Sequence, residues 1–258
     1  MKKLNVQSVF LFFISVLLFV SCMGPGKNTE SGYAVGVVRF DMKTFQNVLD
    51  VDDVTSFYNI KFTNTSEGAC FIVVYEIDYD APENSYESIL ANGFITVSIL
   101  ESKELDQFNM LSSITDTSKV LSNELHILDP IIGGEFYYVK GMGFFSTALE
   151  IPPDQKMYFI LSCNMQDEAK IDNGQRVYDV FLRTTIDRAS SKTPEKTGIL
   201  NAYNMKYFME KFARDEKALG NTTIRLRFNY ASAIKDDQIT WSQQISNEIF
   251  ISSILSDN

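Results

Sequence analysis

Three carboxylates are the first residues whose types and spacing could do chemistry. Glu76, Asp78 and Asp80 alternate in the stretch YEIDYDAP. Successive side chains of a β-strand point to opposite faces, so a strand would place all three carboxylates on one side. Oxygen ligands of this kind suit a hard cation, and they also suit the hydroxyls of a sugar. The stretch is therefore a candidate cation or glycan contact, although a solvated strand end that turns at Pro82 is the simpler interpretation.

The single tryptophan is a second candidate for glycan contact. Trp241 lies in the polar stretch DQITWSQQ. An aromatic ring that is partly exposed offers an apolar face together with a polar N–H group. An exposed aromatic cluster around Trp241 would support glycan binding.

Catalytic constellations are hard to assemble from this composition. His126 is the only histidine, so a Ser/His/Asp triad or a multi-histidine zinc site would depend on it alone. The sequence contains no Gly-x-Ser-x-Gly elbow and no glycine-rich phosphate loop ending in Gly-Lys-Ser/Thr. We therefore expect no enzymatic activity, no catalytic metal and no cofactor.

A cysteine near the start predicts a membrane anchor. Lys2 and Lys3 precede an apolar run over residues 9–20, and Ser21 then precedes Cys22. This is the plan of a secretory signal peptide. The ending FVSC resembles a bacterial lipoprotein signal, in which the cysteine after the cleavage site receives the lipid. We therefore predict lipidation at Cys22 and an outer-membrane location, with the periplasmic or surface face left open.

Net charge limits the partners of the mature chain. Residues 1–21 hold two of the 23 basic residues and none of the 33 acidic ones, so the mature charge is −12. Such a surface disfavours polyanions, so we expect no nucleic acid partner. Only Cys70 and Cys163 follow Cys22, each within an apolar run, and they are either buried thiols or a disulfide.

The elements that must position these residues are mostly strands. Short runs rich in Val, Ile, Phe and Tyr alternate with clusters of turn-forming residues. Helices are not interleaved with them regularly, so antiparallel sheets are favoured. Residues 201–219 have helical periodicity and predict one inserted helix. The predicted strands cover residues 33–40, 57–64, 70–79, 93–100, 135–151, 156–165, 176–186, 223–230 and 247–255.

Four segments follow from this pattern. We predict a signal peptide over residues 1–21, a flexible tether over 22–31, a barrel-like domain over 32–115 and a β-sandwich domain over 116–258. The boundary is placed in residues 106–134, where the strand pattern fades and turn formers accumulate.

The chain resembles the NigD-like lipoproteins, a family of exported proteins of anaerobic Gram-negative bacteria. It does so in the Ser21-Cys22 site and in the stretches GYAVGVVRF, DPIIGGEFYYVKGMGFF, MYFILSCN and VYDVFLRTTID. The resemblance implies an all-β protein, with an N-terminal OB-like barrel followed by an immunoglobulin-like β-sandwich. Residues 42–56 look like an insertion into this pattern. The family offers no catalytic residues that can be transferred to this sequence.

These observations favour a non-enzymatic, lipid-anchored envelope protein that binds a protein or glycan partner. A fimbrillin-like assembly subunit is one alternative, and it requires a terminal strand, such as residues 247–255, that can be donated to a neighbour. A role in bacteriocin immunity or defence is another alternative, and it follows only from the family resemblance.

Overall fold

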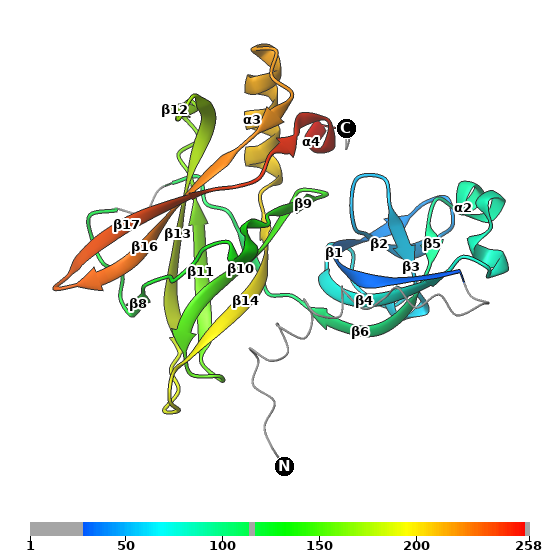
Figure 1. Cartoon of the computed structure of the whole chain (residues 1–258), viewed down its shortest axis with the longest axis horizontal. Coiled ribbons are helices and arrows are strands. Elements are labelled where there is room, and N and C mark those ends of the chain that lie inside the picture. Colours follow the sequence, from blue (N-terminus) through cyan, green and yellow to red (C-terminus); the bar gives the residue numbers. More distant parts are fainter. Residues whose placement is uncertain (1–27, 114–116, 256–258) are drawn as a thin grey trace.

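The structure, a computed structural model, describes residues 28–113 and 117–255 and contains two β domains side by side (Figure 1). Residues 1–27, including the predicted signal peptide and Cys22, lie outside the described residues. The first domain forms one sheet with the strand order β5-β3-β2-β1-β4-β6. The all-β prediction, with an OB-like barrel followed by an immunoglobulin-like sandwich, is confirmed.

The sheet of the first domain closes into a barrel because its two edges are nearly continuous in the chain. β5 and β6 are separated only by Val97, yet β5 pairs with β3 and β6 pairs with β4. The strands are β1 (Thr29–Asp41), β2 (Gln46–Asp50), β3 (Ser56–Tyr58), β4 (Cys70–Asp78), β5 (Ile95–Thr96) and β6 (Ser98–Glu104). A short helix, α2 (Tyr86–Asn92), begins after the capping Ser85 and ends at Gly93, whose φ is 77°.

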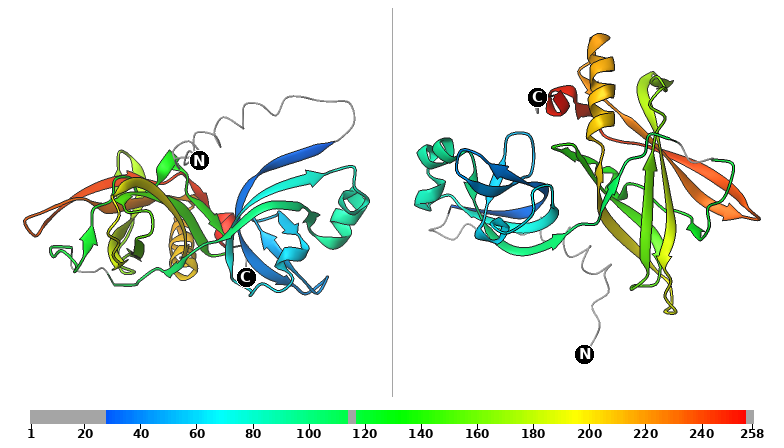
Figure 2. Two further views of the ribbon diagram at one scale, coloured as in Figure 1. Left: turned by 90° about the horizontal axis from the view of Figure 1, so that it is seen from below. Right: turned by 180° about the vertical axis from the view of Figure 1, so that it is seen from behind.

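The second domain is a sandwich of two sheets (Figure 2). The first contains β7 (Gln107–Asn109), β14 (Glu195–Asn204), β10 (Met142–Ile151) and β9 (Tyr137–Val139), in that order. The second contains β11 (Lys156–Ser162), β13 (Gln175–Arg188), β16 (Leu226–Lys235) and β17 (Gln238–Ile245), and β8 (Glu124–Leu125) and β12 (Lys170–Asp172) also pair with β13. Phe145, Leu161 and Phe228 are among the buried side chains of the sandwich core.

Helices cover one end of the sandwich. α3 (Lys206–Ala218) and α4 (Ile251–Leu255) pack together and contribute Phe212 and Ile254 to the core. A small pair, β15 (Thr223–Ile224) and β18 (Ile249–Phe250), lies beside them. Within the described part of the chain, the helices are too short or too polar to cross a membrane.

Several boundaries differ from the prediction. Residues 201–204 finish β14, so the helix predicted from residue 201 begins only at Lys206. The predicted insertion at 42–56 contains β2, which the barrel needs between β1 and β3. β1 already begins at Thr29, inside the predicted tether, because residues 29–32 pair with residues 75–78.

The segment predicted as the terminal strand, residues 247–255, is not a single strand. Residues 247–255 contain the two-residue β18 and then α4, whose Ile251 and Ile254 are buried. The apolar residues of this segment therefore cover the sandwich core and do not form a strand that could be donated to a neighbour.

The chain enters the second domain early. β7 already pairs with β14, so the chain has joined the sandwich at Gln107. The predicted boundary between residues 115 and 116 falls after this strand, within the short segment 114–116 that is outside the described residues.

The two domains share an apolar interface. Val37 of β1, Cys70 of β4 and Leu105 of the connection form one buried cluster with Val139, Met142, Phe144 and Ala202 of the sandwich. The neighbouring residues on the strands, such as Val38 and Val73, face the barrel core instead. Where they cross the interface, β1 and β4 are therefore buried on both faces, which explains the nearly continuous apolar runs in these parts of the sequence.

We expect Phe144→Ala to destabilise both domains together. Phe144 is fully buried in this interface, and truncating such a side chain costs about 3–5 kcal/mol through lost burial and the cavity left behind. For a chain of this size the melting temperature should fall on the order of 10 °C, as measured by calorimetry. Phe250→Ala is the matched control, because Phe250 is 59% exposed. An equally small effect in both variants would contradict the tight packing of the interface.

Candidate functional site

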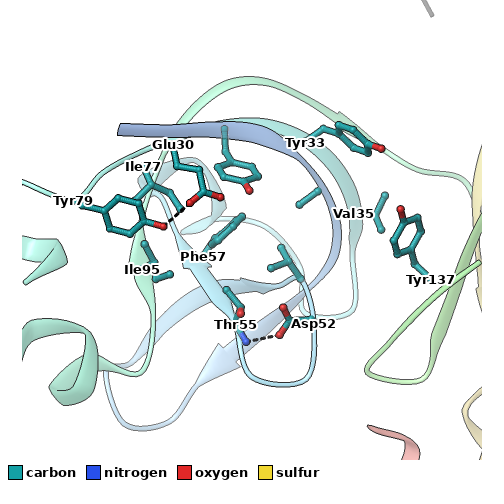
Figure 3. A pocket seen from close by; sticks show the side chains of 13 residues that line it. Glu30, Tyr33, Val35, Asp52, Thr55, Phe57, Ile77, Tyr79, Ile95 and Tyr137 are labelled. Carbon is teal, nitrogen blue, oxygen red and sulfur yellow. Dashed lines mark hydrogen bonds between the residues drawn. The ribbon is translucent and has the colours of Figure 1, made fainter. Parts of the chain in front are cut away.

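A groove of about 510 Å³ opens at one end of the barrel (Figure 3). Its size lies within the range of small-molecule and cofactor sites, which also occur at the mouths of β-barrels. Five aromatic side chains line it, namely Tyr33, Phe57, Tyr75, Tyr79 and Tyr137. Aliphatic side chains, including Ala34, Val51 and Ile95, complete its apolar surface.

The long ribbon of β1 and β4 positions one wall. Gly32 pairs with Tyr75, and Glu30 pairs with Ile77. A methyl group on Gly32 would lie only 3.0 Å from the Tyr75 hydroxyl oxygen and 3.2 Å from its Cζ. The missing side chain of Gly32 thus leaves room for the Tyr75 ring, which also contacts Phe57 with a centroid distance of 4.6 Å.

Glu30 and Tyr79 form a hydrogen-bonded pair at the rim. The Tyr79 hydroxyl donates to Glu30 Oε2 over 2.8 Å. This hydrogen bond to a carboxylate, together with partial burial, raises the pKa of Tyr79 to about 12. Burial and the Glu30 carboxylate also raise the pKa of Tyr75. Both phenols therefore stay protonated near neutral pH and can act as hydrogen-bond donors.

The loop between β2 and β3 supplies the opposite wall. Asp52 Oδ1 accepts hydrogen bonds from the backbone N–H groups of Val54 and Thr55, over 2.8 and 2.7 Å. These bonds hold the loop in a fixed turn. The side chains of Asp52 and Thr55 both line the groove on this wall (Figure 3).

The second domain completes the groove. Tyr137 belongs to β9, and it stands near Tyr33 of β1 (Figure 3). The Tyr137 hydroxyl donates to the carboxylate of Glu135. Burial raises the pKa of Tyr137, and the carboxylate of Glu135 raises it further. The site thus combines side chains from both domains.

The charged side chains that line the groove are all negative. Glu30 and Asp52 are its carboxylates, and none of the thirteen described lining residues is Lys, Arg, His or Cys. Carboxylates accept strong hydrogen bonds from hydroxyl and amino groups, whereas they repel anions. The groove can therefore bind neutral polar or cationic ligands that also present an apolar surface.

The three predicted carboxylates lie beside this groove but do not line it. Asp78 Oδ1 accepts the backbone N–H of Asp80 over 3.0 Å, and Asp80 Oδ2 accepts that of Asn28 over 3.1 Å. β4 ends at Asp78, so Asp80 belongs to the following turn. Glu76 and Asp78 are on the face of β4 opposite Tyr75 and Ile77. Across residues 28–113 and 117–255, no three His, Cys, Asp or Glu residues are grouped so that they could hold a metal ion.

Trp241 lies in the other domain, where its ring supports a buried ion pair. Its Nε1 donates to the carbonyl oxygen of Thr117 over 3.2 Å, and Arg183 Cζ lies 5.8 Å from the ring centroid. Arg183 in turn pairs with Glu124, and both side chains are almost fully buried. The structure therefore does not bring Trp241 together with Glu76, Asp78 and Asp80.

The remaining sequence candidates are also separate from the groove. His126 is exposed in the sandwich domain. Cys70 and Cys163 are free, buried thiols in different clusters, the first at the domain interface and the second in the sandwich core. Burial raises the pKa of each thiol to about 12.

The sequence did contain a signal for the groove. In VYEIDYDAP, the residues that alternate with the three carboxylates are Tyr75, Ile77 and Tyr79, and these line the groove. Glu76 and Asp78 project from the opposite face of this strand. Tyr137 could not be assigned in this way, because its position depends on how the two domains pack.

The first domain is similar to a known family of protein domains. Residues 26–103 match the family described as "Lipoprotein OB domain". The first domain is thus similar to the OB domains of lipoproteins, as the sequence resemblance predicted. No curated protein matches the sequence significantly.

Solved structures are similar to this chain over most of its length. An uncharacterized protein from Parabacteroides merdae ATCC 43184 is 20% identical with a TM-score of 0.75, and the match covers 85% of this chain and 99% of that one. A putative lipoprotein from Bacteroides fragilis NCTC 9343 is 11% identical with a TM-score of 0.55, covering 86% and 99% of the two chains. A NigD-like immunity protein from Bacteroides caccae ATCC 43185 is 13% identical with a TM-score of 0.46, covering 84% and 98%.

We expect Glu30→Gln to lower the pKa of Tyr79 from about 12 towards the usual tyrosine value, because a neutral amide stabilises the protonated phenol less than a carboxylate does. An ultraviolet absorbance titration of tyrosine ionisation measures this change. In the wild type the pair stabilises the fold fully below the usual tyrosine pKa, and this contribution is lost as the pH rises through about 12.

Tyr79→Phe is the control that assigns the signal, since it should remove the same late-titrating group altogether. If the titration curve of Glu30→Gln overlaid that of the wild type, the hydrogen bond between Glu30 and Tyr79 would not exist in solution.

Proposed function

We propose that this chain is a non-enzymatic, lipid-anchored protein of the bacterial cell envelope, attached to the outer membrane through Cys22. Its task is to bind a ligand or partner in the tyrosine-lined groove of the OB domain. The observation that carries this proposal is the groove itself, which joins five aromatic rings and two carboxylates at the mouth of a barrel.

The anchor is supported by two independent features. The Ser21-Cys22 signal follows an apolar run of the kind that directs export, and the domain after it matches an OB domain of lipoproteins. Stable anchoring requires more than one acyl chain, which the diacylglycerol on a lipoprotein cysteine provides.

The distance from anchor to groove is short. Seven residues, Cys22 to Asn28, precede the first residue of β1. Even fully extended, a segment of this length spans no more than about 25 Å. Since Glu30 is at the rim of the groove, a lipid on Cys22 would hold the groove close to the membrane surface.

A role in binding fits the chemistry of the groove better than a role in catalysis. The hydroxyl groups in its wall belong to tyrosines and Thr55, and the tyrosine pKa shifts that are resolved are all upward. A raised pKa keeps a phenol protonated, which suits a hydrogen-bond donor and not a nucleophile.

Intact-mass analysis of protein extracted from its native envelope with detergent tests the anchor. We expect the wild type to begin at Cys22 and to carry the mass of two or three acyl chains. Cys22→Ser should carry none and should leave the membrane fraction. A wild-type protein without acyl mass would overturn the proposal.

Protease shaving of intact cells then determines the face. Digestion of the wild type would place the groove on the cell surface, whereas protection that is lost after outer-membrane permeabilisation would place it in the periplasm.

A further inference from the structure

We infer that the groove binds neutral glycans, with sugar rings lying against Tyr33 and Tyr75 and sugar hydroxyls bonded to Glu30 and Asp52. This inference rests on the proposed function and names the ligand class of the same site.

The aromatic faces provide the apolar part of the recognition. A sugar ring has an apolar C–H face and a rim of hydroxyls, so it needs an aromatic surface with polar groups at the edges. Tyr75, on the barrel-core face of the ribbon, is only partly buried, and Tyr33, on the opposite face of β1, is 47% exposed, so the two rings offer surfaces to different sugar units of one glycan. Phe57, which is 3% exposed, backs the Tyr75 ring and fixes its orientation. Rigid tyrosine rings of this kind give a large contact area at a low entropic cost.

The polar groups match a ligand that both donates and accepts hydrogen bonds. Glu30 and Asp52 are acceptors, while the protonated phenol of Tyr75 is a donor. The single O–H of Tyr79 is already donated to Glu30, so its oxygen offers a ligand only lone pairs. Each carboxylate already accepts a bond within the protein, from Tyr79 and from the loop backbone respectively, so its orientation is set before a ligand arrives. Such preorganisation reduces the ordering cost of binding.

The arrangement of the carboxylates favours a polyhydroxylated ligand over a single ammonium group. Glu30 stands beside Tyr79 on the β1 wall, whereas Asp52 stands beside Thr55 on the loop wall (Figure 3). The two carboxylates thus lie on different walls of the groove. A sugar carries hydroxyls around its whole edge and can reach both walls.

The charge of the groove selects against acidic sugars. None of the thirteen described side chains that line it is basic, so a uronate, sialate or phosphate group would meet Glu30 or Asp52 without a compensating cation. Like-charge contact of this kind is a strong source of specificity. The ligand is therefore a neutral glycan and not an acidic one.

A glycan microarray with neutral and acidic members, followed by calorimetry on the tightest neutral oligosaccharide, tests the inference on the full mature chain. We expect neutral glycans to bind and their acidic counterparts to fail. Tyr33→Ala should lower the affinity for the neutral ligand by about tenfold or more, and Glu30→Gln should lower it by about threefold or more. Tyr33 is partly exposed, so its removal should leave the melting temperature close to that of the wild type.

Tyr207→Ala is the matched control. Tyr207 is 70% exposed on α3, outside the groove. The affinity of the Tyr207→Ala variant for the neutral glycan should therefore stay within twofold of the wild type. Acidic glycans that bound as tightly as neutral ones, or binding that survived Tyr33→Ala, would overturn the inference.

A third outcome separates this inference from the proposed function. If no glycan bound but a lysine-rich or aromatic peptide did, and Tyr33→Ala abolished that binding, the groove would be a protein-binding site and only the glycan class would be wrong. If neither glycans nor such peptides bound, both the inference and the binding role of the groove would fail.

Discussion

The apolar contact between the two domains is the constraint on which the rest of the structure depends. Val37 and Cys70 on the outside of the barrel meet Phe144 and Ala202 on the outside of the sandwich. Each of these strands also faces the core of its own domain, so the strands are buried on both faces where they cross the interface. Separating the domains would expose this whole cluster to water, and the hydrophobic effect therefore holds them together.

The shape of the groove depends on the contact between the two domains. β9 is held beside β10 by backbone pairing, and β10 carries Phe144 at the interface. Tyr137 of β9 therefore reaches the mouth of the barrel at a fixed place, next to Tyr33. The sandwich contributes to the site by positioning this one wall, while the barrel supplies the remaining lining residues.

Much of the fold was predictable because local patterns decide it, whereas the site was not. The alternation in TIRLRFNY and the turn formers between apolar runs indicated strands, and these were confirmed as β15 and β16. The segment 247–255 was misread because short apolar runs do not distinguish a strand from a buried helix. Tyr137 required knowledge of a contact between residues far apart in the sequence. The face of β4 that lines the groove was visible in the sequence but was passed over for its charged neighbours.

The placement of the two cysteines matters for the exported, oxidising location that we propose for this chain. Disulfide exchange requires a thiolate, and burial keeps both Cys70 and Cys163 protonated and out of contact with oxidants. The two thiols are enclosed by different surfaces, since Cys70 is covered by the partner domain and Cys163 by its own. Parting of the domains alone would uncover Cys70, so the docked state itself protects this chain from cross-linking to other thiol proteins wherever oxidants are present.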